Sequence, residues 1–326
     1  MKIEIVLIPL VLLSAGGSSL PIATQALRPA TANWWFKSKR AAAAVAQQQD
    51  KALPRLAFTP KELVAIRNTY DKVLKENGGN VGEKISLRAL AVTVLASNLD
   101  VAKAARKYAK FLRAVGDCGV ERMDFVDGAV EELTKDPRIV REFRQSYKLC
   151  GADHGGGSIM WIHGEGVDPE REASSVRAGI LYWLAVHADA VSMREGITLI
   201  IDASKLGPAT KRGNEGKLQR VNQSYPLRPR SMMICGAPLP VRVFLNSLFR
   251  ATSVFTGDEN LLRQIRFEPV ERVVREHIPT SSAPRDLGGR GGGVENIEKW
   301  VKDRVLSIPV PSLAVANSIG SVAGRS

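Results

Sequence analysis

The stretch Gly196-Ile-Thr-Leu-Ile-Ile-Asp202 predicts a buried β-strand, because an apolar and largely β-branched run lies between a glycine and an aspartate. Two similar short runs, Ile159-Met-Trp-Ile162 and Ser231-Met-Met-Ile-Cys235, predict one strand before it and one after it. Helical patterns at 176–191 and 217–224 separate the three strands. This alternation predicts an α/β fold with a mostly parallel sheet covered by helices.

A small all-α bundle is predicted in front of the sheet. Thr59-Pro60-Lys61-Glu62 is typical of a helix start, in which Thr59 caps the helix and Glu62 completes a capping box. Helical spacing of apolar residues continues to Gly78-Gly79 and recurs near 87–95, 101–112, 123–133, 139–147 and 294–306. We expect five segments: a targeting or disordered leader (1–49), a helical bundle (50–115), connecting helices (116–150), an α/β domain (151–290), and a C-terminal helix with a flexible tail (291–326).

The first 27 residues have the pattern of a signal peptide. Lys2 precedes the nine-residue apolar run 5–13, which is too short to span a bilayer, and Thr24-Gln-Ala26 resembles a signal-peptidase site. The part after Ala26 lacks acidic residues up to residue 49 and is rich in Ala, Thr, Ser, Lys and Arg, as transit peptides are. We therefore expect a plastid location reached through the secretory route. The cytoplasmic face of a membrane and the secretory pathway are the alternatives.

The composition is that of an ordinary soluble protein. Of the 326 residues, 44% are hydrophobic and 24% are charged, which excludes a mainly disordered or collagen-like chain. Beyond Leu27 no apolar run approaches the ~20 residues that span a bilayer, so we expect any membrane contact to be peripheral. The three cysteines, Cys118, Cys150 and Cys235, have neither disulfide nor zinc spacing and are expected to be buried thiols.

The net charge of +13 predicts an anionic partner. Zinc-ligand spacings, aromatic RNA-binding strands and long Lys/Arg blocks do not occur in the sequence, so we do not expect nucleic acid binding. An anionic membrane surface is the expected partner. Protein partners cannot be named from the sequence.

Candidate catalytic motifs each lack a necessary part. His154-Gly-Gly-Gly157 resembles the oxyanion loop of lipases, but no Gly-x-Ser-x-Gly nucleophile motif occurs in the sequence. The segment 288–293 lacks the spacing of a phosphate-binding loop and is interpreted as a linker. None of the four histidines pairs with another at metal-ligand spacing; His187 is expected in the core, and Asp202 is expected to cap a turn. We therefore predict no catalytic residue, no metal and no cofactor.

The order of short motifs from Leu87 to Gly289 resembles the CRAL-TRIO family of lipid-binding proteins. The first is the leader 87–104, with its Leu-Arg start and its turn Leu99-Asp-Val-Ala-Lys-Ala104. The others follow in the family's order: Asp153 to Gly166 as a loop and first strand, Gly196 to Asp202 as a strand ending in Asp, Ser224-Tyr-Pro226, Met232 to Pro238, and Ile278-Pro279 through Asp286-Leu-Gly-Gly289. The match covers about 200 of the 326 residues.

The resemblance implies a sheet that floors an apolar pocket, a gate helix that closes it, and the exchange of one lipid between the pocket and membranes. Ile197, Leu199 and Ile201 share one face of their strand and would lie on the pocket floor. The segment after Pro238 matches the gate and has an apolar stripe of Val241, Phe244, Leu245 and Leu248. The alternative for this segment is an ordinary surface helix packed on the core.

The expected lipid-binding residues are Ile180, Trp183, Leu184, Ile197, Leu199, Ile201, Met233, Leu239, Val243, Phe244 and Leu248. The expected membrane-contact residues are Arg242, Leu245, Phe249 and Arg250, because arginines beside an apolar stripe suit anionic headgroups. The only ligand expected is the bound lipid.

Departures from the family pattern bear on the choice of lipid. Phosphatidylinositol-binding members carry an acidic residue after Tyr-Pro and a lysine after the gate, where this chain has Leu227 and Gln264. Polar residues of the same members correspond to Ile197 and Leu199. Because a buried phosphate without partners is costly, we expect a more hydrophobic cargo. The alternatives are a hydrolase that uses the His154 loop and a pseudo-carrier that binds only a membrane or a protein.

Overall fold

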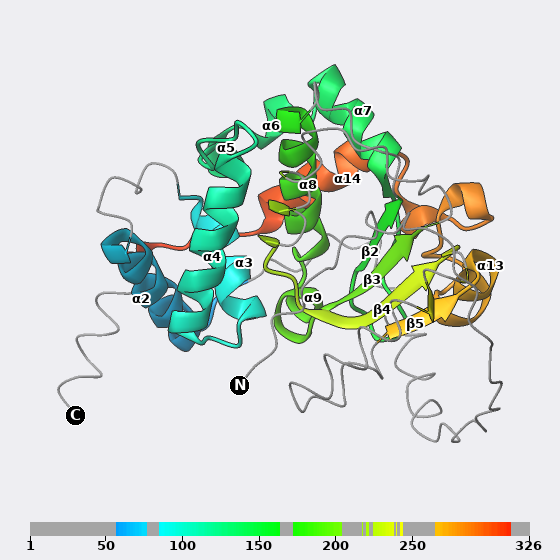
Figure 1. The fold of residues 1–326 in the computed structure, drawn as a ribbon, viewed down its shortest axis with the longest axis horizontal. Coiled ribbons are helices and arrows are strands. Elements are labelled where there is room, and N and C mark those ends of the chain that lie inside the picture. Colours follow the sequence, from blue (N-terminus) through cyan, green and yellow to red (C-terminus); the bar gives the residue numbers. More distant parts are fainter. Residues whose placement is uncertain are drawn as a thin grey trace, which may run out of the picture.

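The computed structural model describes residues 57–76, 85–163, 172–203, 217, 220–221, 224–237, 239, 242–243 and 265–313. Helices and a five-stranded sheet make up an α/β fold, with the helices α2–α4 on one side and the sheet on the other (Figure 1). The predicted leader 1–49 lies outside the described residues. So do Val241, Phe244, Leu245, Leu248, Phe249, Arg250 and Gln264.

Three helices precede the sheet: α2 (Pro60–Glu76), α3 (Leu87–Ala96) and α4 (Val101–Gly116). The predicted capping box at the start of α2 is confirmed. The N–H of Thr59 donates to Oε2 of Glu62 over 2.8 Å, and the N–H of Glu62 donates to Oγ1 of Thr59 over 3.3 Å. The side chains of Ser86 and Asp100 cap α3 and α4.

Short helices lead from α4 to the sheet: α5 (Phe125–Gly128), α6 (Val130–Leu133) and α7 (Pro137–Ser146). The single helix expected over 176–191 is two helices, α8 (Glu172–Val186) and α9 (Ala190–Glu195). The break lies before Asp189, whose carboxylate accepts the N–H of Ser192 over 2.8 Å and so caps α9. Aspartate forms this cap more favourably than it continues a helix.

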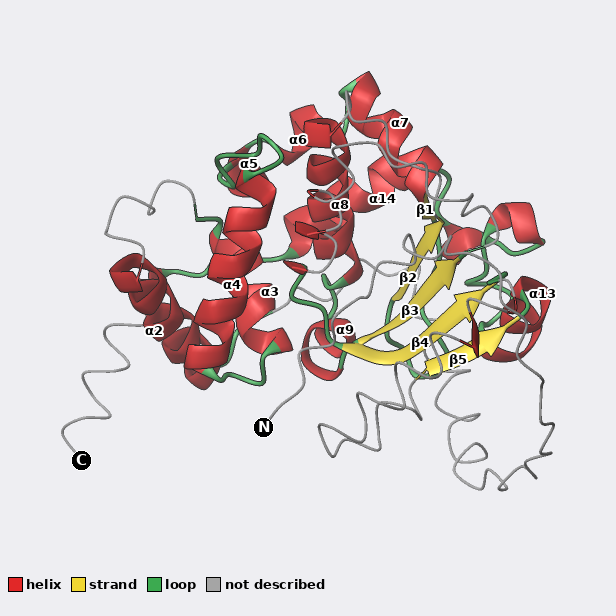
Figure 2. Cartoon of the chain, in the orientation of Figure 1, coloured by secondary structure: helices red, strands yellow, loops and turns green. Residues whose placement is uncertain are grey.

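The sheet has the order β1 (Tyr147–Lys148), β2 (Ile159–His163), β3 (Ile197–Asp202), β4 (Pro229–Cys235) and β5 (Ile265–Glu268) (Figure 2). β1 is antiparallel to β2, and the other neighbouring strands are parallel. The prediction of a mostly parallel sheet is therefore confirmed. β2, β3 and β4 were expected from the sequence, whereas the edge strands β1 and β5 were not.

The chain after β5 packs on the sheet and returns to the helices. It forms α13 (Val270–Arg272), a π-helix (Val273–His277), two 3₁₀ turns (Arg285–Leu287 and Gly291–Gly293) and α14 (Ile297–Ser307). The glycine-rich segment 288–293, expected to be a linker, is packed instead. A Cβ on Gly289 would stand 2.1 Å from the carbonyl oxygen of Ala283, and one on Gly292 would stand 2.9 Å from the Cα of Gly151.

Two hydrophobic clusters cover the two faces of the sheet. The larger cluster is continuous from α2, α3 and α4 through α8 to α14. The smaller cluster joins Trp161, Ile200 and Met233 to the segment 273–283. Arg88 links α3 to the end of α14, because its buried guanidinium group donates to the carbonyl oxygens of Ile308 and Val126 over 2.8 Å each. All three cysteines are buried and free, as expected.

Candidate functional site

One row of side chains crosses all five strands near the carboxyl ends of β2–β5. The register pairs Tyr147 with Ile162, Ile162 with Ile201, Ile201 with Ile234, and Ile234 with Phe267. Side chains at paired positions point to the same face, so the five residues form one strip, which we call the apolar row. Ligands of open α/β sheets bind near the carboxyl ends of the strands, so this row is the candidate binding floor.

The apolar row is less covered than the rest of its face. Four of its members are only partly buried, and Ile234 is the buried one. One row nearer the amino ends of the parallel strands, Met160, Leu199 and Met232 are buried in the same core as α8. The packing of α8 therefore seals the middle of the sheet more completely than its carboxyl end.

The structure divides the predicted lipid-binding residues among several environments. Ile180, Trp183 and Leu184 lie on α8 and are fully buried, as are Ile197 and Leu199 on β3. Ile201 belongs to the apolar row and is partly buried. Leu239 and Val243, which follow β4, are exposed by 67% and 58%.

Met233 lies on the other face of the sheet. It pairs with Ile200, and both pack with Trp161 in the smaller cluster. Because successive side chains of a strand alternate between faces, Met233 cannot share a floor with Ile201. This corrects the expectation that both line one pocket.

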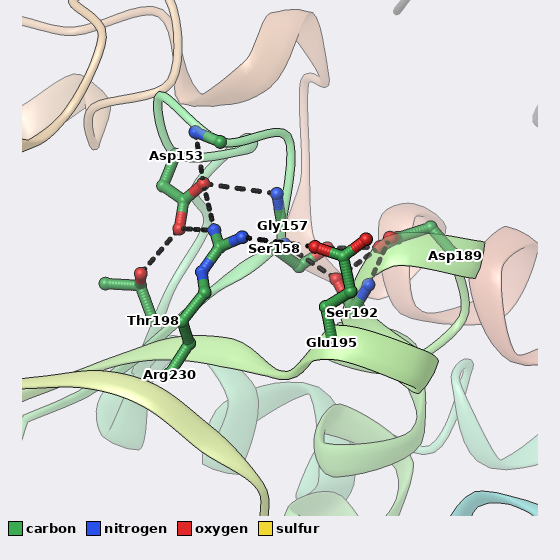
Figure 3. A network of polar contacts seen from close by, with 9 residues as sticks. Asp153, Gly157, Ser158, Asp189, Ser192, Glu195, Thr198 and Arg230 are labelled. Atoms are coloured by element: carbon green, nitrogen blue, oxygen red, sulfur yellow. Dashed lines mark hydrogen bonds and ion pairs between the residues drawn. The ribbon is translucent and has the colours of Figure 1, made fainter. Parts of the chain in front are cut away.

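The loop from Asp153 to Gly157 folds around its own carboxylate (Figure 3). Oδ1 of Asp153 accepts the N–H groups of Gly155 and Gly157 over 2.8 and 3.1 Å, and the N–H of Gly156 donates to the Asp153 carbonyl oxygen over 3.0 Å. The side chains of Arg230 and Thr198 bind the same carboxylate from the sheet. The three glycine N–H groups that an oxyanion loop would direct at a substrate are thus used within the turn.

A second buried network lies beside this loop. Oδ2 of Asp189 accepts hydrogen bonds from the hydroxyls of Ser158 and Ser192 over 2.7 Å each, and Nη2 of Arg304 lies 2.6 Å away (Figure 3 shows the two serines). Burial acts to raise the pKa of Asp189, but the charge of Arg304 and the hydrogen bonds outweigh burial, so the pKa is lowered. Asp189 is therefore ionised, and Arg304 joins α14 to the start of α9.

A row of titratable residues lies on the face opposite the apolar row. The register aligns His163, Asp202, Cys235 and Glu268 at the ends of four strands. Burial, with the nearby carboxylates of Asp202 and Glu268, raises the pKa of Cys235 to about 12, so the thiol stays protonated at neutral pH and is a poor nucleophile. Among the described residues, no group of three potential ligands could hold a metal ion.

His187 is buried completely between α8 and α9. Its Nδ1 lies 2.8 Å from the carbonyl oxygen of Trp183, whereas its Nε2 has no hydrogen-bond partner among the described residues. Burial lowers the pKa of His187 to about 4, so the ring is neutral near pH 7. The core position expected from the sequence is confirmed.

No family model matches the chain, and no curated protein matches it either. Within the described part of the chain, no helix combines the length and the apolar character needed to cross a bilayer.

Proposed function

We propose that this protein binds one hydrophobic lipid against the apolar row and exchanges it with membranes. The observation that carries the proposal is the row itself, an apolar strip across five strands whose members Tyr147, Ile162, Ile201 and Phe267 are only partly buried. Each large apolar side chain gains roughly 1.5–3 kcal/mol when it is fully withdrawn from water. A lipid chain laid along the row would supply that cover.

The residues just beyond β4 support contact with a membrane. Leu239, Arg242 and Val243 each have a helical conformation, and the side chains of Leu239 and Val243 are exposed. They are two of the four most exposed large apolar side chains of the described residues. An exposed apolar pair beside an arginine suits the interface of an anionic membrane.

Purified protein is expected to carry lipid at close to one molecule per chain. A lipid-sized apolar site is unfavourable when it holds poorly bonded water, so the lipid should remain bound through purification. Native mass spectrometry, followed by solvent extraction and lipid analysis, measures the stoichiometry. Folded protein that is free of lipid, and that takes up none from vesicles, would contradict lipid binding.

Phosphatidylinositol is not expected to be the preferred cargo. Leu227 is a partly buried apolar residue against the larger core, at the position where the resemblance places an acidic residue, and the apolar row contains no cation. A phosphorylated headgroup would therefore lose water without gaining charged partners. Competitive loading from vesicles that contain equal amounts of phosphatidylinositol and a neutral isoprenoid lipid tests this. Enrichment of phosphatidylinositol in the protein would show the prediction to be wrong.

A further inference from the structure

The outer side of α4 carries a line of cations. Lys103, Arg106, Lys107, Lys110 and Arg113 recur at spacings of three and four residues, so they lie along one side of the helix. We call these five residues the basic ridge. Arg106, Lys110 and Arg113 are exposed, and Lys103 and Lys107 are partly buried. At about 1.5 Å per residue, the ridge is about 15 Å long.

The opposite side of α4 belongs to the hydrophobic core. Ala104, Ala105, Tyr108 and Phe111 are completely buried, and the centroid of the Phe111 ring lies 5.4 Å from that of Trp183 on α8. The helix also packs against α2 and α3. Because this apolar side fixes the rotation of the helix, the basic ridge is held on the outside of the bundle.

Charge is balanced differently on α4 and on its neighbour α2. On α2, Arg67 pairs with Asp71 over 2.9 Å and Lys72 pairs with Glu76 over 3.1 Å. The sequence of α4 contains no aspartate or glutamate with which a ridge cation could form such a pair. Like charges at this spacing disfavour a helix, so the ridge is retained at a cost to folding. Features that oppose stability are typical of functional surfaces.

The composition of α4 restricts the kind of partner. Protein interfaces depend on apolar or aromatic anchors, and surfaces that bind single-stranded nucleic acid use aromatic side chains for stacking. Both aromatic residues of α4 are buried, and none of the most exposed large apolar side chains of the described residues lies on this helix. An anionic lipid surface requires neither feature, since each nearby Lys or Arg strengthens binding about five-fold through its charge alone.

We propose, on the basis of the membrane exchange proposed above, that the basic ridge docks the protein on the anionic surface of a membrane. The helix lies parallel to the bilayer, and its cations contact the lipid headgroups without insertion of apolar side chains. Figure 1 shows α4 among the helices on the side of the molecule away from β4 and β5. The docking surface is therefore distinct from the exposed Leu239 and Val243, which follow β4.

The test reverses charge at positions where reversal should not harm the helix. In the variant Lys103→Glu with Arg106→Glu, each new glutamate lies four residues before a ridge lysine, Lys107 or Lys110. This order of charges stabilises helices, so the variant should unfold at a temperature no lower than the wild type. Three cations and two anions then leave the ridge with a charge of +1 in place of +5.

Binding is measured by co-sedimentation of the full chain with two kinds of vesicle, phosphatidylcholine alone and equal parts of phosphatidylcholine and phosphatidylserine. We expect the wild type to bind the anionic vesicles more tightly, and the variant to bind them at least about 25-fold more weakly, because two cations are lost. Raising the salt concentration to about 1 M should remove most of the wild-type binding, because the screening length falls to about 3 Å.

The matched control changes the net charge equally at a different place. Arg141→Glu with Arg290→Glu replaces two exposed arginines outside α4. Since charges away from the contact are screened, this control should lose less than about five-fold in affinity for the anionic vesicles. A control that loses as much as the ridge variant would show an effect of net charge alone and would overturn the proposal.

The remaining outcomes also decide the proposal. A ridge variant that binds the anionic vesicles as tightly as the wild type overturns it. So does a variant that loses affinity for a DNA duplex but not for the vesicles, which would assign the ridge to nucleic acid. If the glutamates disturb folding, Lys103→Gln with Arg106→Gln gives the same comparison. None of these measurements depends on lipid uptake, so docking can fail while lipid binding stands, and lipid binding can fail while docking stands.

Discussion

Replacement of Arg304 by methionine is expected to lower the free energy of unfolding by about 3–5 kcal/mol. The Arg304 side chain is only 12% exposed, and its guanidinium group donates to the carbonyl oxygen of Ala185 over 2.6 Å as well as to the hydroxyl of Ser158 and the carboxylate of Asp189. Methionine removes the guanidinium group, whose Cζ lies 5.0 Å from the centre of the Trp300 ring, and leaves the buried carboxylate of Asp189 without its counter-charge. Chemical denaturation of both proteins at pH 7 measures the difference.

The pH dependence of the same variant identifies the cause. In the wild type the pKa of Asp189 is lowered, so its stabilising contribution is present above the unfolded pKa of about 4 and is lost only as the pH falls through the lower, folded value. Without Arg304, burial should raise the folded pKa above the unfolded one. Lowering the pH from 7 to 5 should therefore recover part of the lost stability of Arg304→Met, and a loss that does not change with pH would contradict this explanation.

Arg144→Met is the matched control for Arg304→Met. Arg144 pairs with Glu298 on the same helix α14, but its side chain is 63% exposed. Exposed ion pairs contribute about 0–1 kcal/mol, so the control should differ little from the wild type. Equal losses of unfolding free energy in the two variants would mean that the buried ion pair of Arg304 stabilises the protein no more than the exposed pair of Arg144 does.

Replacement of Gly196 by alanine is expected to cost about 3 kcal/mol or more of stability. Gly196 joins α9 to β3 with φ +107°, a conformation that residues with a Cβ rarely adopt, and the new Cβ would stand 2.4 Å from the carbonyl oxygen of Arg228. That oxygen accepts the N–H of Ile197 over 3.0 Å, so any relief of the clash disturbs the start of the β3–β4 pair. Overpacking of this kind adds about 1–3 kcal/mol to the backbone strain.

Gly116→Ala provides the comparison for Gly196→Ala. Gly116 ends α4, its φ is not positive, and no atom lies within 4 Å of the position of a Cβ. Alanine there should be neutral or stabilise the protein by up to about 1 kcal/mol. The unfolding midpoints of the two variants should differ by about five to ten degrees only if the conformation at Gly196 is the one described, since about 1 kcal/mol shifts the midpoint by about two degrees in a protein of this size.

Local patterns predicted most of the elements correctly. The capping box Thr59-Pro60-Lys61-Glu62 and the strand that ends at Asp202 each depend on a few consecutive residues. They could therefore be predicted without knowing which other segments pack against them. The break before Asp189 was missed because apolar residues continue through Ala188 and hide the change of direction. β1 and β5 were missed because two and four residues are too few to show a period, and pairing with β2 and β4 defines them.

The candidate site depends on relations between segments that no single stretch contains. Alternation within β3 placed Ile201 on one face, but the face of a β4 residue depends on the register between the strands. That register shifts between Ile197 and Thr198, so the sequence of β4 alone does not tell which face Met233 occupies.

A ribosome makes the chain from its amino end. The hydrogen bond from Arg88 on α3 to the carbonyl oxygen of Ile308 therefore cannot form until 220 further residues have been added. The face of the sheet that carries Trp161 and Met233 likewise remains open until the segment 273–283 has been translated. During most of its synthesis the nascent protein therefore lacks one acceptor of the Arg88 guanidinium group and exposes the sheet face that carries Trp161. We expect a chain that stops before residue 270 to remain bound to chaperones and to be removed by proteolysis, whereas the completed chain escapes both.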